Sequence, residues 1–345
     1  MNVVISRGLK MRNKTWIYSL SLIILLMIAS TGCTSTPQAP KTQEGNLANQ
    51  PLKLTKEFKF DKKKTGEFVE GAQLGKDFPL STTYGYYYVY SMSALGQEIK
   101  KQHQDKLISA LKKTQAEDGG FTWDTHTKGS DMYDTYCAVW TLKKLGALDQ
   151  MDTAKVEEFI KSCSNKDGGF CLSPGQESRP IDTYYCVATL NTLGKLSSAD
   201  KSSIEGYLKP LQAKDGGFAL RKDIPGNVQC TYAALHVLNM MDLLDIVDKE
   251  KTTAFLVSDQ AKDGGFGYMV GDKNINSPEN AYYVLSSLRL LDSLDKIKAK
   301  PLSTFLKDRY VGDGGFCDVY YGNSKYPSTY YGIGCLAELG YVKNP

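Results

Sequence analysis

Three aspartates occupy positions where a buried carboxylic acid could donate a proton. Asp131 and Asp134 stand three residues apart, and Asp182 follows one repeat later. Carboxyl groups that lie close together raise one another's pKa, which keeps one of them protonated for general-acid chemistry. At the start of an apolar helix the same residues could instead cap that helix, because they accept hydrogen bonds from its free amides. The Asp-Thr pair recurs at 134–135 and 182–183, and this recurrence favours capping.

Aromatic side chains form a second set of candidate functional residues. The chain holds 22 Tyr, and many of them gather at the expected starts of apolar helices. Aromatic walls with polar tips suit large, partly apolar ligands such as isoprenoids, glycans or corrinoids. A second interpretation is that these rings only pack between helices, and the sequence leaves both open. The ligand-binding candidates are Tyr86, Tyr133, Tyr136, Trp140, Tyr184, Tyr185, Tyr232, Tyr282, Tyr283, Tyr330 and Tyr331.

Histidine and cysteine patterns predict no metal site and no cofactor. His103, His126 and His236 lie far apart in the sequence, and none has a second ligand at metal-binding spacing. Seven cysteines follow residue 50, an odd number that cannot all pair within one chain. Cys163 and Cys171 bracket one turn and could form a disulfide.

The elements that must position these residues repeat along the chain. The tetrapeptide Asp-Gly-Gly-Phe recurs at intervals of 48 to 50 residues, and such a fixed period is the signature of a repeat architecture. The glycines suit a helix C-terminus because they adopt positive φ without steric cost, and the Asp can accept hydrogen bonds from the turn. The five copies lie at residues 118–121, 167–170, 215–218, 263–266 and 313–316.

Each repeat contains two kinds of helix. The stretch before a turn has a polar face, as in 152–163, and the stretch after each loop is apolar nearly all round, as in 136–142. A helix of the second kind must be buried on most sides, and the amphipathic helix covers it. Repeats that contact only their neighbours build a curved solenoid, and closure into a ring removes its ends. The sequence therefore predicts an all-α ring of about six hairpins, in which residues 53–78 supply the outer helix missing after Leu339.

The repeat resembles the prenyltransferase/squalene-cyclase superfamily. Gln115, Gln212 and Gln260 stand three residues before their Asp, and each repeat joins this motif to a Tyr-rich apolar helix. The resemblance covers residues 82–339 and is greatest to the β subunit of the protein prenyltransferases. It implies an α/α toroid over residues 53–345, with inner helices around a funnel. It also implies either an enzyme of the prenyltransferase or terpene-cyclase type or a binding protein with that fold.

The catalytic residues of that superfamily do not carry over to this chain. Protein prenyltransferases hold zinc through Asp, Cys and His side chains, and Ser277, Glu279 and Ser328 stand at the matching positions. Zinc takes about four N, S or O ligands, so we expect no zinc site. The Asp-x-Asp-Asp acid motif of the cyclases is also absent. The three aspartates described above remain as the acid candidates.

The first 32 residues resemble the signal peptide of a bacterial lipoprotein. Four basic residues precede an apolar run over 16–29, and Thr31-Gly32-Cys33 is similar to the lipobox, whose Cys is lipidated. The run is shorter than the roughly 20 residues that span a membrane. We expect Cys33 to carry the lipid, palmitate among its acyl chains, and to anchor the protein to the extracytoplasmic face of the cell membrane. Residues 33–52 then form a flexible tether. An uncleaved N-terminal anchor is the alternative.

Charge argues against nucleic acid as a partner. The net charge is +4, and the four basic residues of the signal segment account for the whole excess. A nucleic-acid-binding protein carries a basic surface on its folded part. Three functions remain: binding of a hydrophobic or amphipathic small molecule, a divergent enzyme with an Asp acid, and a surface scaffold for a protein partner.

The Tyr-rich end of the funnel is the predicted working surface. Variable loops follow each Gly-Gly-Phe and border this end, and binding specificity usually lies in such loops around a fixed concave scaffold. The loops are residues 125–130, 173–179, 222–226, 272–277 and 323–326.

Overall fold

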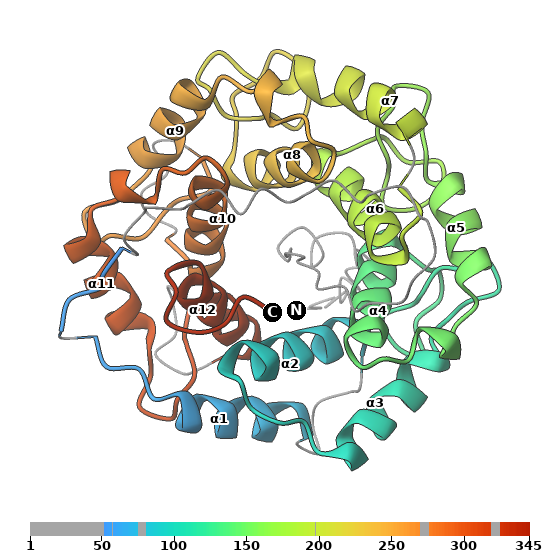
Figure 1. Cartoon of the computed structure of the whole chain (residues 1–345), viewed down its shortest axis with the longest axis horizontal. Coiled ribbons are helices and arrows are strands. Elements are labelled where there is room, and N and C mark those ends of the chain that lie inside the picture. The colour runs from blue at the N-terminus through green and yellow to red at the C-terminus, as the bar shows by residue number, and fades with distance from the viewer. Residues whose placement is uncertain (1–51, 57, 75–80, 197, 270–275, 319–324) are drawn as a thin grey trace, which may run out of the picture.

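The structure is a closed ring of helices in two concentric layers (Figure 1). This computed structural model describes residues 52–345 except 57, 75–80, 197, 270–275 and 319–324. Each inner helix packs against the next, and the last packs against the first, which closes the ring. The inner helices are α2 (Thr82–Leu95), α4 (Met132–Lys144), α6 (Pro180–Leu193), α8 (Val228–Met240), α10 (Pro278–Leu290) and α12 (Tyr326–Glu338).

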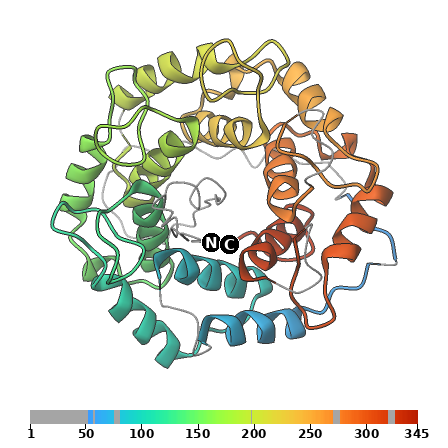
Figure 2. The ribbon, with the colours of Figure 1, turned by 180° about the vertical axis from the view of Figure 1, so that it is seen from behind.

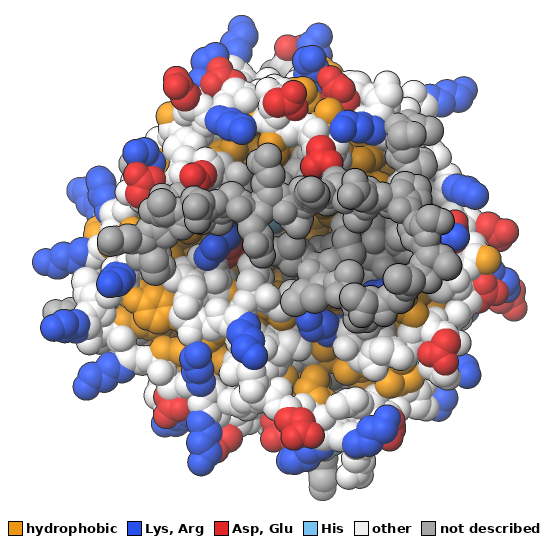
Figure 3. Space-filling view, in the orientation of Figure 1, with side chains coloured by type: hydrophobic (Ala, Val, Ile, Leu, Met, Phe, Trp, Pro, Cys, Tyr) orange, Lys and Arg blue, Asp and Glu red, His pale blue; other side chains and the backbone are white. Residues whose placement is uncertain are grey.

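The outer layer surrounds the inner helices and faces the solvent (Figure 2). Helix α5 buries Val156, Phe159 and Ile160 and leaves its lysines exposed, whereas the inner helix α4 is buried throughout 132–142. Charged side chains accordingly gather around the circumference (Figure 3). The outer helices are α1 (Lys62–Leu74), α3 (Lys101–Lys112), α5 (Thr153–Ser162), α7 (Ser198–Leu208), α9 (Lys249–Ser258) and α11 (Ala299–Arg309). Short 3-10 helices are η3 (Leu148–Gln150), η4 (Lys209–Leu211), η5 (Leu244–Ile246) and η6 (Leu294–Lys296).

Each Asp-Gly-Gly-Phe motif forms the same tight turn. In the first copy, Oδ1 of Asp118 accepts a hydrogen bond from the N–H of Gly120 (3.1 Å), and Gly119 has a φ of +91°. A Cβ on Gly119 would lie 2.1 Å from the carbonyl oxygen of Lys155 in the following outer helix, so only glycine fits. The Phe of every copy is buried. The turn therefore joins each hairpin to the next one.

Helix α1 takes the place of the sixth outer helix. The fifth turn packs on it as the other turns pack on the following outer helix, because a Cβ on Gly314 would lie 2.6 Å from the carbonyl oxygen of Lys64. The segment before α1 is held by α11 and its turn: the rings of Phe60 and Tyr310 lie 5.5 Å apart. The prediction that residues 53–78 complete the ring is confirmed, with the helix itself at 62–74.

The predicted all-α toroid is confirmed. Isolated β-bridges at the turns are the nearest approach to a sheet in the part of the chain that the structure describes. None of its described helices combines the length and the apolar character that a membrane crossing requires. Residues 1–51, which carry the predicted signal peptide, Cys33 and most of the tether, lie outside the described residues.

Cysteines 163 and 171 do not form the disulfide that their spacing allows. Both are buried free thiols, and Sγ of Cys171 donates to the carbonyl oxygen of Cys163 at 3.1 Å. Burial raises the pKa of the Cys163 thiol to about 12, so it stays protonated and unreactive.

Candidate functional site

Six tyrosines form a closed belt around the axis of the toroid. Each inner helix contributes one, and each ring contacts the ring from the next helix at centroid distances between 5.7 and 6.4 Å. Equivalent residues meet at one level, so the inner helices run parallel and begin at the same end, which we call the mouth. The tyrosine belt consists of Tyr86, Tyr136, Tyr184, Tyr232, Tyr282 and Tyr330, none more than 1% exposed.

Several phenol hydroxyls at the axis are buried without a hydrogen-bond partner. Hydroxyls of neighbouring tyrosines, such as Tyr330 beside Tyr86, are near enough to influence their pKa but do not form a hydrogen bond of normal geometry with them. Burial raises their pKa well above the ordinary range, so they stay neutral. An unsatisfied buried hydroxyl costs roughly 1–3 kcal/mol, and native proteins usually satisfy it with protein groups or water. Within the described residues, these hydroxyls belong to Tyr86, Tyr90, Tyr232, Tyr282 and Tyr330.

A second set of tyrosines contacts the belt and lies nearer the mouth. The ring of Tyr87 stacks on Tyr330 at 4.4 Å, and its hydroxyl lies 3.1 Å from that of Tyr133 in the first turn of α4. The rings of Tyr133 and Tyr185 are 5.0 Å apart. Hydroxyls of this set form hydrogen bonds with one another and with Glu279. Its members are Tyr87, Tyr133, Tyr185, Tyr283 and Tyr331.

Glu279 is the carboxyl that two of these tyrosines hold. It lies in the first turn of α10, and its Oε1 accepts hydrogen bonds from the hydroxyls of Tyr283 (2.7 Å) and of Tyr331 on α12 (3.0 Å). Its second oxygen, Oε2, forms no hydrogen bond with a described residue, and Glu279 keeps partial exposure to solvent. Burial raises the pKa of Glu279 to about 8, and the two hydroxyls oppose this only in part. Glu279 is therefore mostly protonated at neutral pH.

Trp140 and His236 contact the belt tyrosines. Trp140 packs on Tyr86 at 4.7 Å and on Tyr90 at 6.2 Å. His236 places Nε2 3.0 Å from Oγ of Ser286, and burial lowers its pKa to about 3. The imidazole is therefore uncharged at neutral pH and serves as a hydrogen-bonding group.

Asp131 and Asp134 have different environments at the start of α4. Asp131 caps the helix, because its Oδ1 accepts the N–H of Asp134 at 2.8 Å. The buried carboxyl of Asp134 accepts hydrogen bonds from the hydroxyls of Thr82 and Thr83 at the start of α2. Burial raises the pKa of Asp131 to about 6 and that of Asp134 well above its ordinary value, where the charge of Asp131 adds to the effect. These effects favour the protonated form of Asp134, but its side chain joins α2 and α4 outside the tyrosine belt.

Asp182 is held by an arginine. Arg179 donates from Nε to Oδ2 (2.6 Å) and from Nη2 to Oδ1 (2.8 Å), a bidentate pair. Burial raises the pKa of Asp182 to about 6 although the guanidinium opposes it. The carboxylate is therefore mostly ionised at neutral pH, which makes it a poor proton donor.

The structure brings all the predicted aromatic residues together at the axis and leaves the three predicted acids at the helix starts. Sequence reasoning missed the role of Glu279, which it considered only as an inadequate zinc ligand. Its spacing to Tyr283 is the signal that could have found it, because residues four apart share one face of a helix. Of the predicted mouth loops, 272–275 and 323–324 lie outside the described residues.

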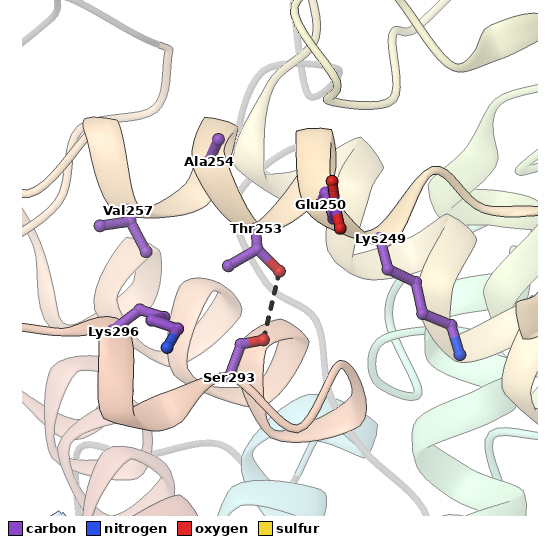
Figure 4. A pocket seen from close by; sticks show the side chains of 7 residues that line it. All are labelled: Lys249, Glu250, Thr253, Ala254, Val257, Ser293 and Lys296. Atoms are coloured by element: carbon purple, nitrogen blue, oxygen red, sulfur yellow. Dashed lines mark hydrogen bonds between the residues drawn. The ribbon is translucent and has the colours of Figure 1, made fainter.

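A separate groove of about 500 Å³ lies in the outer layer, between α9 and η6 (Figure 4). Oγ1 of Thr253 lies 3.3 Å from Oγ of Ser293 across it. The lining residues are Lys249, Glu250, Thr253, Ala254, Val257, Ser293 and Lys296.

Comparison with known families agrees with this geometry. The sequence profile of the prenyltransferase alpha-alpha toroid domain matches residues 15–180 and 177–344. The chain belongs to this family. The beta subunit of geranylgeranyl transferase type-1 from Arabidopsis thaliana is 30% identical to it over 88 residues. That match covers 25% of this chain and 23% of the relative, so it spans less than a quarter of the relative's length.

Solved structures show the same prenyltransferase toroid. Protein geranylgeranyltransferase-I from Candida albicans, complexed with GGPP, has a TM-score of 0.67 at 14% identity, over 82% of this chain and 92% of that chain. A type II terpene cyclase from Scytonema, in complex with geranylgeranyl dihydroxybenzoate, has a TM-score of 0.57 at 11% identity, over 81% and 95%. At identities this low, the similarity establishes the shared fold alone. The chemistry of this toroid must be argued from its own side chains.

Proposed function

We propose that this protein is anchored by a lipid on Cys33 to the extracytoplasmic face of a cell membrane and binds a hydrophobic or amphipathic small molecule among the tyrosines at its axis. The observation that carries the proposal is the group of five buried phenol hydroxyls without partners. An interior built only for packing would favour Phe or Leu, because these leave no polar atom to satisfy. Tyrosines at these places are expected where water or a polar group of a ligand meets the hydroxyls.

The ligand is proposed to enter at the mouth. The carbonyl oxygen of Tyr268 accepts the N–H of Val228, the first residue of α8, so this loop borders the mouth. Tyr268 is 36% exposed and its neighbour Met269 is 40% exposed. Leu220, which is 43% exposed, stands two residues after the Phe of the preceding turn, as Tyr268 stands two residues after the Phe of its own turn. Exposed apolar loop tips that border the mouth suit a ligand with an apolar portion.

Ligand binding is tested by native mass spectrometry of the protein purified from its own cells. We expect a bound small molecule whose occupancy falls in Tyr282→Phe and Tyr330→Phe, which keep the rings and remove belt hydroxyls. Tyr207→Phe is the matched control, because this outer-layer tyrosine also buries an unsatisfied hydroxyl and lies outside the belt. A protein without bound molecules, or occupancy that is unchanged in both belt variants, would refute the proposal.

We infer that the catalytic zinc of the protein prenyltransferases has no place here. Oγ of Ser277 caps α10 by accepting the N–H of Asn280 (3.1 Å), and Glu279 is held by two tyrosines. Ser328 supplies a neutral hydroxyl, which is not among the usual zinc ligands. The residues at the matching positions therefore do not fit the metal.

A terpene-cyclase-type enzyme is the second candidate function, and the environment of Glu279 favours it. A carboxylic acid that stays protonated at neutral pH beside an aromatic interior is suited to act as a general acid. Asp134 is the strongest of the three aspartates for the same role, because the environments of Asp131 and Asp182 favour capping and ion pairing. Turnover of geranylgeranyl dihydroxybenzoate that Glu279→Gln abolishes and Asp134→Asn preserves would support this function. Turnover unchanged in Glu279→Gln would exclude this acid.

A scaffold for a protein partner is the remaining alternative. The groove between α9 and η6 offers the apolar side chains of Ala254 and Val257 beside Lys249, and a protein interface combines such an apolar centre with a polar rim. This role predicts that substitutions in the groove, and not in the tyrosine belt, disrupt function in the cell.

A further inference from the structure

Glu279 offers a carboxylate oxygen that the described part of the protein leaves without a partner. Oε1 accepts both tyrosine hydroxyls, and Oε2 accepts none. Two donors on one carboxyl group stabilise its ionised form. Buried carboxylates are normally paired with a cation as well. The site therefore supplies what an ionised Glu279 needs, except for a positive charge to pair with it.

The described arginines of the inner-helix layer form ion pairs with other carboxylates. Arg179 makes its bidentate pair with Asp182, and Nε of Arg289 lies 2.7 Å from Oε2 of Glu338. No ion pair between described residues includes Glu279. No described side chain supplies this cation, and a ligand that carries one would complete the site.

The walls around this carboxyl are aromatic. The rings of Tyr283 and Tyr331 lie 6.1 Å apart at an angle of 73°. Burial raises the pKa of Tyr268 at the mouth, and the nearby Cys230 and Glu279 add to this rise. Aromatic rings attract cations, and a carboxylate attracts a cation and repels an anion. A phosphate head group would meet repulsion here, and an ammonium group would meet attraction from both the carboxyl and the rings.

We propose that the mouth recognises amphiphiles with an N–H-bearing ammonium head group, which donates to Oε2 of Glu279 while the apolar chain extends toward the tyrosine belt. The inference rests on the proposed ligand-binding function and names its ligand class, long-chain primary or secondary amines. An N–H group is required because Oε2 needs a hydrogen-bond donor, which a quaternary ammonium lacks. On binding, Glu279 ionises and its proton passes to solvent.

The test compares three probes with the same six-carbon chain: hexylamine, hexanol and hexanoate. They are titrated calorimetrically into the full chain in phosphatidylcholine nanodiscs. We expect the protonated amine to bind about tenfold more tightly than the alcohol, and hexanoate to bind most weakly. Glu279→Gln keeps the shape of the side chain and removes the charge, so the ratio of amine to alcohol affinity should fall to about one. Glu177→Gln removes the same charge from an exposed mouth loop and should keep the wild-type ratio.

Equal affinity of the wild type for hexylamine and hexanol, or a preference that persists in Glu279→Gln, would overturn the head-group inference. In that case hexanol binding that weakens in Tyr282→Phe and Tyr330→Phe would leave the proposed ligand-binding function standing. Glu279→Asp keeps the charge and shortens its reach, so it should retain part of the preference. This second variant distinguishes loss of charge from local misfolding.

Discussion

Replacing Glu279 by Gln should make the protein more stable at alkaline pH and flatten its stability profile. The folded state raises the pKa of this carboxyl from an ordinary 4.5 to about 8, so it binds the proton more tightly than the unfolded chain does. Stability is therefore greatest below the unfolded pKa, falls as the pH rises from about 4.5 to about 8, and is level above that range. The Gln side chain does not titrate, and its amide oxygen can accept both tyrosine hydroxyls.

The magnitude follows from the same two pKa values. A tenfold change in proton affinity corresponds to about 1.4 kcal/mol, so the full interval corresponds to roughly 5 kcal/mol. Because Glu279 keeps partial exposure, water relieves part of this cost. We expect the wild type to lose about 2–3 kcal/mol more than the variant between about pH 5 and pH 8.

Urea unfolding followed by circular dichroism at several pH values measures this difference. The other carboxyls with raised pKa, such as Asp131 and Asp182, destabilise both proteins as pH rises and cancel in the comparison. Glu177→Gln, in an exposed loop, should follow the wild type at every pH. Parallel curves for wild type and Glu279→Gln would refute the account of a buried, protonated acid.

Three further predictions concern the turns, the zinc position and the buried aspartate. Gly216→Ala should lower the free energy of unfolding in urea by about 2–4 kcal/mol, because its φ is +94° and a Cβ would lie 2.4 Å from the carbonyl oxygen of Lys251. Gly206 is in a helix and has open space where a Cβ would be, so Gly206→Ala should stabilise the protein by up to about 1 kcal/mol. Zinc-loaded and desalted protein should hold far less than one zinc per chain in metal analysis. Thermal melts should show Asp134→Asn near wild type and Asp134→Ala less stable by about 2 kcal/mol, because only Asn retains the threonine hydrogen bonds.

The period of the sequence was sufficient to predict the ring, because the structure reuses the same contacts in every repeat. The glutamine before three of the five turns is an example: Oε1 of Gln115 accepts the N–H of Asp152 (2.9 Å), and its Nε2 donates to the carbonyl oxygen of the same residue (2.9 Å). Five nearly identical turns therefore encode five nearly identical junctions. The fifth turn packs on α1, and the choice of this helix as its partner was predictable only from the need to close the ring.

The candidate site was less predictable because it depends on what differs between repeats. Asp134 and Asp182 occupy equivalent places, yet one meets threonines from the preceding inner helix and the other meets Arg179. The second partner of Glu279 is Tyr331, 52 residues away on the next inner helix. Periodicity shows that such neighbours exist and does not show which side chains meet.

The contrast between the belt and Glu279 explains why the carboxyl is the better guide to function. Six tyrosines at one level form a nearly uniform belt, which offers no feature that distinguishes one end of a ligand from the other. Glu279 is off the belt, at the mouth, and is bonded by tyrosines of only two of the six inner helices. It therefore breaks the symmetry of the ring. In the proposed complex it would give the amphiphile a direction, with its head at the mouth and its chain toward Trp140. In a fold built from near-identical repeats, the residue that departs from the repeat is the one able to confer specificity.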